Sequence, residues 1–191
     1  MDPFNSYLIQ QRELYGSSFY LDNNYDEIYR IIKNCSKCKG DLNSEIIFIG
    51  EESYLKNEKE NSSFLYESNQ LFSKIISAIS LSVKDIFTTN IVKVFYQDHD
   101  VDKIENIYDC RQHLEFKMQL VETKVIIALG QSAANFLLDN SMTIKEMRKI
   151  KLRYKNVRLF TTYSPSSLII DENLKKPCWD DFKRIKTNYI D

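Results

Sequence analysis

Short apolar segments alternate with amphipathic ones along most of this chain. Four apolar segments have the length and the β-branched composition of strands: EIIFI (45–49), IFTTNIV (86–92), KVIIAL (124–129) and VRLFTTY (157–163). Between and after them, apolar residues recur every three or four positions, which predicts helices at 68–80, 102–121, 131–138 and 178–189. Strands that are apolar throughout and separated by helices are typical of a parallel sheet buried on both faces.

The fold class predicted by this pattern is α/β, as a three-layer α/β/α sandwich around a central parallel sheet of four strands. Asp2 followed by Pro3 is a typical helix start, and helical spacing continues intermittently to residue 34. Because the chain has 191 residues and no linker-like tract, we expect one domain over 1–191. Its parts are N-terminal helices in 2–34, a CxxC segment in 35–44 and the α/β core in 45–191.

Composition and charge narrow the expected compartment and partners. The chain has no apolar run long enough to span a membrane and no secretory signal, so we expect a soluble, cytoplasmic monomer. Its four cysteines are then more typical of metal ligands or thiols than of disulfides. The formal net charge is only -1, but residues 145–158 carry seven basic side chains and one acidic one. Such a stripe is typical either of a solvated turn or of a surface that binds a polyanion.

Candidate site residues follow the ends of the predicted strands. In an open parallel sheet, ligands bind beyond the carboxyl ends of the strands. The residues in those places are Gly50, Glu51 and Glu52, then Asn90, then Gly130, Gln131 and Ser132, and finally Ser164, Pro165 and Ser166.

The order and spacing of these motifs resemble the uracil-DNA glycosylase superfamily, most closely its type-4, iron–sulfur branch. Cys35-x-x-Cys38 precedes a strand that ends in Gly50-Glu51, where the family reads G-E-A-P-G. SSFLYESNQLF is similar to P-F-V-G-x-A-G-Q-L-L, and TNIVKV to T-N-V-V-K-C. KVIIALGQSAANFLL, TTYSPSSLI and KKPCWDDFKRI resemble the later motifs in the same order. The resemblance covers nearly the whole chain after residue 34.

This resemblance implies a pocket that holds a base flipped out of DNA. Phe64 takes the position of the aromatic platform on which the base stacks. Asn90 takes the position of base recognition, where a primary amide can pair with both N3–H and O4 of uracil. Core packing for Phe64 and capping of a strand end for Asn90 are the structural alternatives.

Two glutamates compete for the role of catalytic carboxylate, which would stabilise positive charge on the sugar or orient water. Glu51 matches the type-4 pattern. GEESYL also resembles the type-1 motif G-Q-D-P-Y-H, which makes Glu52 the carboxylate and Tyr54 the residue that excludes the methyl group of thymine. Ser164 stands where the family has a histidine that hydrogen-bonds the uracil oxygen, so catalysis is expected to be slow, altered or absent.

Contacts with the DNA backbone are implied for two segments. Pro165, Ser166, Ser167 and Leu168 match the loop that grips phosphates, with Leu168 as a wedge into the duplex. Arg148 and Lys149 match the family's R-G and would add phosphate contacts. A loop without a ligand and a solvated basic turn are the structural alternatives.

The metal set is incomplete relative to the family. Cys35, Cys38 and Cys110 would hold a [4Fe–4S] cluster, but Val94 replaces the remaining cysteine. His113, three residues after Cys110 on a predicted helix, would complete a zinc set, and Cys178 is another candidate fourth ligand. A cluster, zinc or another metal, and a site without metal therefore all stay open.

Two functional hypotheses result. The first is a DNA glycosylase of base-excision repair that removes uracil or another deaminated base from DNA by hydrolysing the N-glycosidic bond. The second is a catalytically degenerate family member that binds nucleic acid or a partner protein without excising a base.

Overall fold

The structure is a computed structural model that describes residues 30, 33, 38–53, 58–82, 84–93 and 105–190. The chain divides into two compact units, Met1–Cys35 and Ser36–Asp191, and the fold below is that of the second. The predicted helices in 2–34 lie outside the described residues, except that Arg30 and Lys33 are both helical. The single domain over 1–191 stays a prediction.

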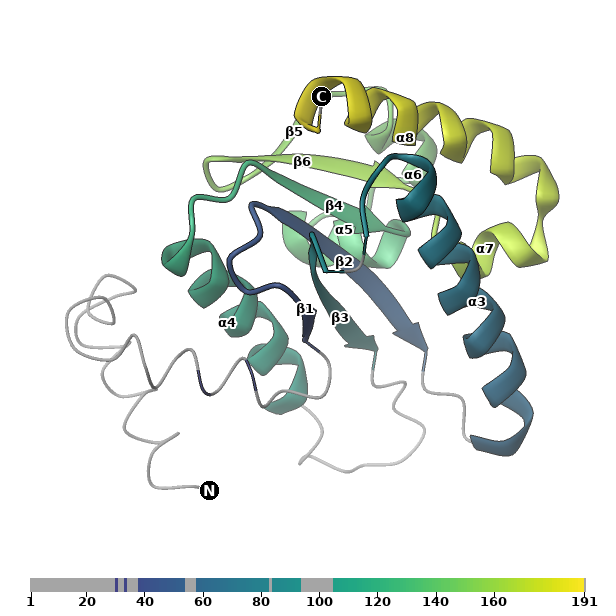
Figure 1. The fold of residues 1–191 in the computed structure, drawn as a ribbon, viewed down its shortest axis with the longest axis horizontal. Coiled ribbons are helices and arrows are strands. Elements are labelled where there is room, and N and C mark those ends of the chain that lie inside the picture. Colours follow the sequence, from purple (N-terminus) through teal and green to yellow (C-terminus); the bar gives the residue numbers. More distant parts are fainter. Residues whose placement is uncertain are drawn as a thin grey trace. The chain divides into compact units, whose positions relative to one another are not determined.

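The described part of the second unit contains a six-stranded sheet in the order β1-β3-β2-β4-β6-β5 (Figure 1). Its strands are β1 (Lys39–Gly40), β2 (Ile46–Ser53), β3 (Phe87–Lys93), β4 (Val125–Leu129), β5 (Leu152–Tyr154) and β6 (Val157–Thr162). The four strands in the middle are parallel to one another, and β1 and β5 add antiparallel edges. The predicted parallel sheet of four strands is confirmed.

The two edge strands were not predicted because both are short and polar. β5 lies inside the basic stripe, where Leu152 and Tyr154 are buried and Arg153 between them is exposed. Three residues of such alternation are too few to distinguish from a turn. Lys155, with a φ of 50°, and Asn156 connect β5 to β6. Half of the stripe is therefore a hairpin.

The helices are α3 (Glu58–Ala78), α4 (Glu105–Leu120), α5 (Gln131–Leu138), α6 (Ile144–Met147), α7 (Pro165–Ile170) and α8 (Lys175–Tyr189), with a 3₁₀ turn at Glu172–Leu174. α3 begins ten residues before the predicted start and therefore includes Phe64, which lies outside the predicted helix. Glu58, Lys59 and Glu60 favour this longer helix, because they are good helix formers and acidic side chains stabilise a helix N-terminus.

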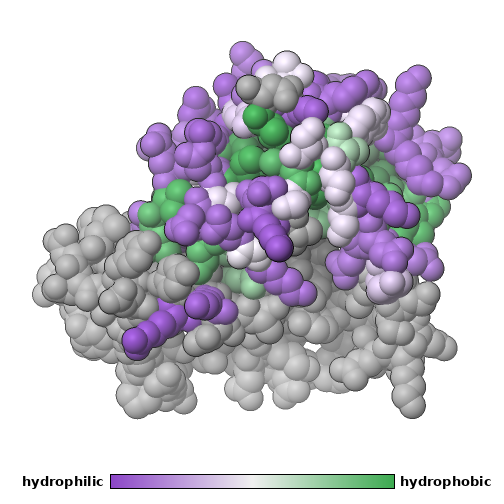
Figure 2. Space-filling view, viewed as in Figure 1, coloured by the Kyte–Doolittle hydropathy of each residue, from purple (hydrophilic) through white to green (hydrophobic). Residues whose placement is uncertain are grey.

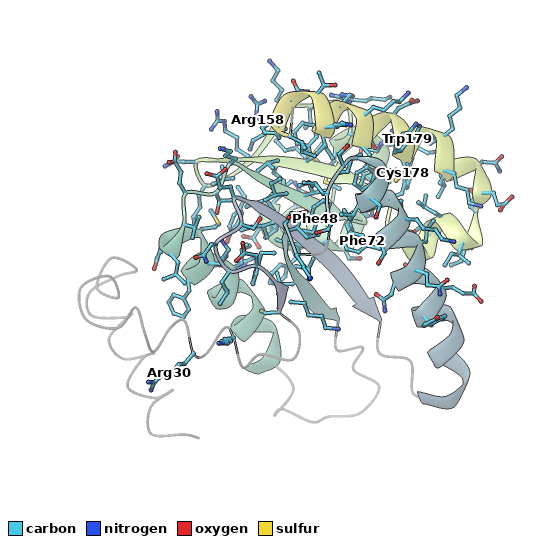
Figure 3. The ribbon with its side chains drawn as sticks, viewed as in Figure 1. Arg30, Phe48, Phe72, Arg158, Cys178 and Trp179 are labelled. Atoms are coloured by element: carbon cyan, nitrogen blue, oxygen red, sulfur yellow. The ribbon has the colours of Figure 1, made fainter. Side chains whose placement is uncertain are left out.

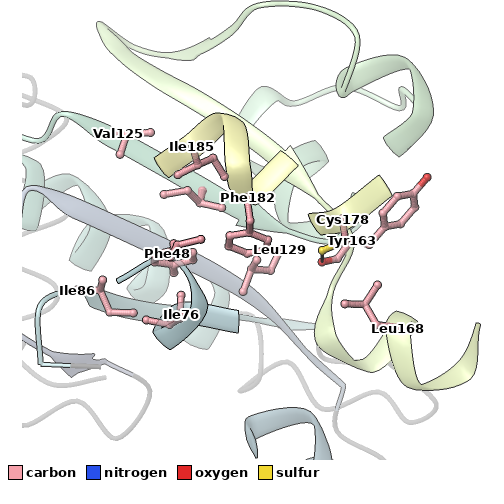
Figure 4. Close-up of a cluster of buried hydrophobic side chains, with 12 residues drawn as sticks. Phe48, Ile76, Ile86, Val125, Leu129, Tyr163, Leu168, Cys178, Phe182 and Ile185 are labelled. Atoms are coloured by element: carbon pink, nitrogen blue, oxygen red, sulfur yellow. Dashed lines mark hydrogen bonds between the residues drawn. The ribbon is translucent and has the colours of Figure 1, made fainter. Parts of the chain in front are cut away.

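One face of the sheet is covered by α3, α7 and α8. Its core joins Phe48 of β2 and Ile127 of β4 to Ile76 of α3, Leu168 of α7 and Phe182 of α8 (Figure 4). The Phe48 ring stacks against Phe182 at 6.4 Å between ring centres (Figure 4). It also meets the ring of Phe72 edge-on at 5.5 Å, and Figure 3 labels both residues. Side chains of a strand alternate between its faces, so the buried residues next to Phe48 and Ile127 point to the opposite layer.

The opposite layer contains α4 and α5, which contribute the buried side chains of Leu114, Ala133, Ala134 and Leu137. The three-layer architecture predicted from the sequence is therefore confirmed. On the surface shown in Figure 2, apolar residues are visible mainly in a band among hydrophilic ones. No helix in the described part of the chain combines the length and apolar character needed to cross a bilayer.

The strand order places a ligand crevice between β2 and β4. From β2 the chain crosses to β3 on one side, and from β4 it crosses to β6 on the other, so the connections diverge there. In open α/β sheets, the carboxyl ends at such a switch point form the binding crevice. The sheet register pairs Gly50 with Asn90 across β2 and β3, and Leu129 with Thr162 across β4 and β6.

Candidate active site

The carboxyl ends of β2 and β3 bring two predicted site segments together. Glu51 and Glu52 belong to β2, which continues past its predicted end to Ser53, and they pair in register with Ile91 and Val92. Asn90 is one residue before Ile91, so its backbone is adjacent to that of Gly50. The side chains of Glu51, Glu52, Phe64 and Asn90, and all of Tyr54, lie outside the described part of the structure.

Gly130 connects β4 to α5 at the same rim. Its φ of 102° lies in a region that favours glycine, and its N–H donates to the carbonyl of Thr162 at 2.8 Å. The next candidate, Gln131, has a structural partner, because its side-chain oxygen accepts a hydrogen bond from the N–H of Ile144 at 3.0 Å. The turn after β4 is thus hydrogen-bonded to both β6 and the start of α6.

Ser164 caps helix α7 rather than pointing freely into the crevice. It is 3% exposed, and its hydroxyl oxygen accepts from the N–H of Ser167 at 3.3 Å. The same hydroxyl is 3.0 Å from the Ser166 hydroxyl and 2.8 Å from that of Ser167. Proline at the first helical position completes a favourable N-terminus. To donate to a substrate, Ser164 would have to exchange one of these local hydrogen bonds.

The structure corrects the wedge predicted at Leu168. Its side chain is 2% exposed and packs in the core between sheet and helices (Figure 4). Residues 165–170 form a helix instead of the expected loop, which turns Leu168 inward one turn after the cap. Pro165, Ser166 and Ser167 are half-buried, whereas Ile170 at the end of α7 is 78% exposed.

Arg148 is held by contacts within the protein. Its Nε donates to Asp181 at 2.5 Å and one terminal nitrogen donates to the same carboxylate at 3.1 Å. That nitrogen also donates to the carbonyl of Pro177 at 2.8 Å, and the guanidinium lies 5.0 Å from the centre of the Tyr163 ring. Burial opposes the charge of Arg148, but the hydrogen bonds and negative charge of Asp181 outweigh it and raise the pKa of Arg148.

The predicted phosphate contact of Arg148 therefore has to share this side chain with Asp181, which also accepts from the Thr162 hydroxyl at 2.8 Å. Lys149 is exposed. A cleft of about 540 Å³ lies here between α6 and α8, lined by Lys145, Arg148, Lys149, Tyr163, Asp181 and Arg184. Arg184 was not predicted, because it lies far from the basic stripe in the sequence, and the resemblance of KKPCWDDFKRI to the family's closing motif assigned it no role.

The candidate metal ligands are only partly described. Cys38 precedes β1 and its thiol lies 3.6 Å from the Thr89 hydroxyl of β3, to which it donates. Cys110 and His113 are on α4, which contacts β3, but their side chains lie outside the described residues, as does Cys35. The described residues contain no group of three side chains that could hold a metal ion.

Cys178 does not fit the alternative role of fourth ligand. It is 2% exposed in the core and interacts with Thr162 of β6, which is separated from β3 in the sheet by β2 and β4. Burial raises the pKa of its thiol to about 11, so the thiolate needed for metal binding is disfavoured. The sequence could not show this, because the burial of a cysteine depends on tertiary contacts and not on the residues next to it in the chain.

An open α/β sheet with glycine, amide and serine residues near its switch point, next to a basic cleft, is typical of the class of proteins that bind nucleotides or nucleic acid. The family model of the uracil DNA glycosylase superfamily matches residues 39–183, and this chain belongs to that superfamily.

Its curated relatives include three proteins named type-4 uracil-DNA glycosylase. The one from Saccharolobus solfataricus is 24% identical over 185 residues, which cover 86% of each chain. The one from Sulfurisphaera tokodaii is 25% identical, with 84% of this chain and 83% of the relative covered. The one from Archaeoglobus fulgidus is 23% identical, with 84% and 90% covered.

Proposed function

We propose that this protein is a DNA glycosylase that removes uracil or another deaminated base from DNA. Hydrolysis breaks the bond between the base and C1′ of deoxyribose, water adds its oxygen to C1′, and the departing base takes up a proton. The observation that carries the proposal is the sheet register, which sets Asn90 beside Gly50 at the switch point. Membership of the superfamily and the names of the relatives support it.

The roles proposed for individual residues follow their places at this rim. Asn90 recognises the base edge, Phe64 stacks on its face, and Glu51 or Glu52 stabilises the developing charge on the sugar. Tyr54 excludes the thymine methyl group if Glu52 is the carboxylate. Tyr54 and the relevant side chains lie outside the described residues, so these roles rest on backbone position and on the family's motifs.

The test is base excision by the purified chain from single- and double-stranded oligonucleotides that carry uracil or deaminated purines. Alkali breaks the strand wherever a base has been removed. Asn90→Ala should abolish the breaks because it removes both hydrogen bonds to the base. Glu51→Gln and Glu52→Gln, measured separately, assign the carboxylate, since loss of the correct one lowers the rate by on the order of 10²-fold or more. Breaks that persist in Asn90→Ala would refute this site.

A second function is favoured by the geometry of Ser164. A capping hydroxyl engaged with Ser166 and Ser167 is a poor substitute for an imidazole that donates to the base. The chain would then bind DNA without excising a base. Intact strands together with salt-sensitive DNA binding would establish this function. If the missing donor is the only defect, Ser164→His should increase excision, provided that thermal unfolding shows the variant to be folded.

For the metal, we propose that Cys35, Cys38 and Cys110 with His113 hold a [4Fe–4S] cluster or a zinc ion. Three thiolates and an imidazole can complete four-coordination. The segment before β1 and helix α4 both lie next to β3, which supports a common location for Cys38 and Cys110. Metal analysis and visible absorption of anaerobic protein distinguish iron from zinc. Cys38→Ala should lose the metal, whereas Cys178→Ala should keep it; retention of metal by Cys38→Ala would exclude this set.

A further inference from the structure

A second hollow adjoins the basic cleft between α6 and α8. It measures about 300 Å³, and its walls include Phe160 and Thr161 of β6 and Asn188 and Tyr189 of α8. It shares Arg148, Asp181 and Arg184 with the basic cleft, so the two form one groove. The groove extends from Tyr163, after the end of β6, to Arg158 near its start. In Figure 3, Arg158 lies toward the C-terminal end of α8 and Cys178 and Trp179 toward the other.

The two parts of the groove differ in chemistry. The cleft presents Lys145, Lys149 and Arg184 around the Arg148–Asp181 pair, and Arg184 is 61% exposed with its guanidinium 4.0 Å from Asp181. Three cations around a single carboxylate, already bound to Arg148, leave an excess of positive charge. The hollow instead has an aromatic wall, where Phe160 and Tyr189 meet edge-on at 5.3 Å, and the amide of Asn188.

The hollow also contains an exposed amide. Asn188 lies in its α8 wall, and its side-chain nitrogen donates to the carbonyl of Arg184 at 2.6 Å. The second N–H and the carbonyl oxygen of this amide are left for the polar edge of a ligand.

We propose that this groove binds one nucleotide of an unpaired DNA strand, with the phosphate in the basic cleft and the base in the adjacent hollow. A positively charged groove beside an aromatic surface is the usual arrangement for single strands. A base that is still paired cannot enter the hollow, so a duplex would not satisfy both parts. This proposal depends on the proposed function only because it takes DNA as the ligand. The groove is a separate site from the pocket proposed at the carboxyl ends of β2 and β3.

The groove therefore gives the protein a preference for DNA with a single-stranded segment next to the base to be removed. Because the groove begins at Tyr163, directly before Ser164, a strand that leaves the rim can continue into it. The residues that decide this preference are Lys149, Arg184 and Asn188, none of which contributes to the proposed chemistry at the rim.

The test is equilibrium binding of the full chain to a fluorescent oligothymidylate, which contains no base to be excised. Arg184→Glu and Lys149→Glu should each weaken binding by about tenfold, and each lost phosphate contact should reduce the salt slope by roughly 0.7. The matched control is Lys183→Glu, the neighbour of Arg184 on α8, whose side chain is 56% exposed and lines neither part of the groove. Asn188→Leu should weaken binding a few-fold without lowering thermal stability, because the Asn188 side chain is exposed and lies in the wall of the hollow.

Any of three results would overturn this site. The first is an equal loss of affinity in Arg184→Glu and Lys183→Glu, and the second is tighter binding of the matching duplex than of the single strand. The third is binding of thymidine monophosphate as tight as that of the oligonucleotide, which would indicate a free nucleotide as the ligand. Excision is measured separately. If binding depends on the groove but no base is excised, the proposed function is refuted and the groove site stands. If Arg184→Glu changes neither excision nor oligothymidylate binding, the groove site is refuted and the proposed function stands.

Discussion

Two cations, one half-buried and one fully buried, connect the two sides of the sheet to their helices in different ways. Arg148, after α6, reaches α8 through the carboxylate of Asp181. Lys117 of α4 is fully buried and donates to a neutral group, the carbonyl of Ser44 before β2, at 2.7 Å. Its ammonium also lies 5.8 Å from the centre of the Phe87 ring.

The consequence appears in their pKa values. The pKa of Arg148 is raised, because Asp181 outweighs the cost of burial. The pKa of Lys117 is lowered to about 8 by burial, which the more distant charges of Asp41 and Glu45 offset only in part. Arginine keeps its charge at every physiological pH, and Asp181 balances that charge, whereas a buried lysine without a carboxylate partner makes stability depend on pH.

The largest expected effect is that of Asp181→Ala. It leaves the half-buried Arg148 without its counter-charge and the buried Thr162 hydroxyl without an acceptor, so the free energy of unfolding should fall by about 3–5 kcal/mol. Urea denaturation at neutral pH measures this. Asp180→Ala, on the exposed side of the same helix, is the control and should unfold like the unchanged protein. Equal effects of the two substitutions would contradict the role given to Asp181.

The next effect is the pH dependence that Lys117 confers. Between its folded pKa of about 8 and its unfolded value of 10.5, the unfolded chain holds a proton that the folded chain has released. The free energy of unfolding should therefore rise with pH over this window, by at most about 3 kcal/mol from this group. The difference between the protein and Lys117→Met isolates the contribution. The measurement runs from about pH 7.5 to about pH 10.5, which spans the folded and unfolded pKa values. If the difference in unfolding free energy between the two proteins stays constant over this range, Lys117 is not held as described.

Arg148→Lys should have a smaller effect than loss of Asp181. Lysine keeps the positive charge but cannot reproduce the paired hydrogen bonds to Asp181 or the bond to Pro177. We expect a loss of about 2 kcal/mol in the free energy of unfolding. Chemical denaturation of Arg148→Lys and Asp181→Ala under the same conditions compares their free energies of unfolding. A lysine variant as unstable as Asp181→Ala would mean that geometry, and not charge, dominates this pair.

The smallest effect is expected for Glu45→Gln. Glu45 forms an exposed ion pair with Lys124, and such pairs contribute little to stability. Its charge also supports that of Lys117, so the substitution should lower the pKa of Lys117 and move the pH window to lower values. Titration of stability in this variant shows whether the onset moves down. A shift to higher pH would contradict the placement of Glu45 near Lys117.

Much of the fold was predictable from the sequence because buried parallel strands are apolar without interruption. The segments that became β2, β3, β4 and β6 were recognised for that reason, with small errors at their ends. β1 and β5 were missed because edge strands need only a few residues and tolerate charges. Of the candidate site, the strand-end rule led to the rim residues, and the sheet register brings Gly50 and Asn90 together.

What the sequence determined by itself was the order of the four central strands and the longer helices, the residues at the strand ends and membership of a superfamily, because each depends on neighbours along the chain. Only the tertiary structure decided that Ser164 caps a helix, that Leu168 and Cys178 lie in the core, and that Arg184 joins Lys149 in one groove. Lys117 and Ser44 are 73 residues apart, and Arg148 and Asp181 are 33 apart. Burial and charge pairing arise from such distant contacts, so no local pattern records them.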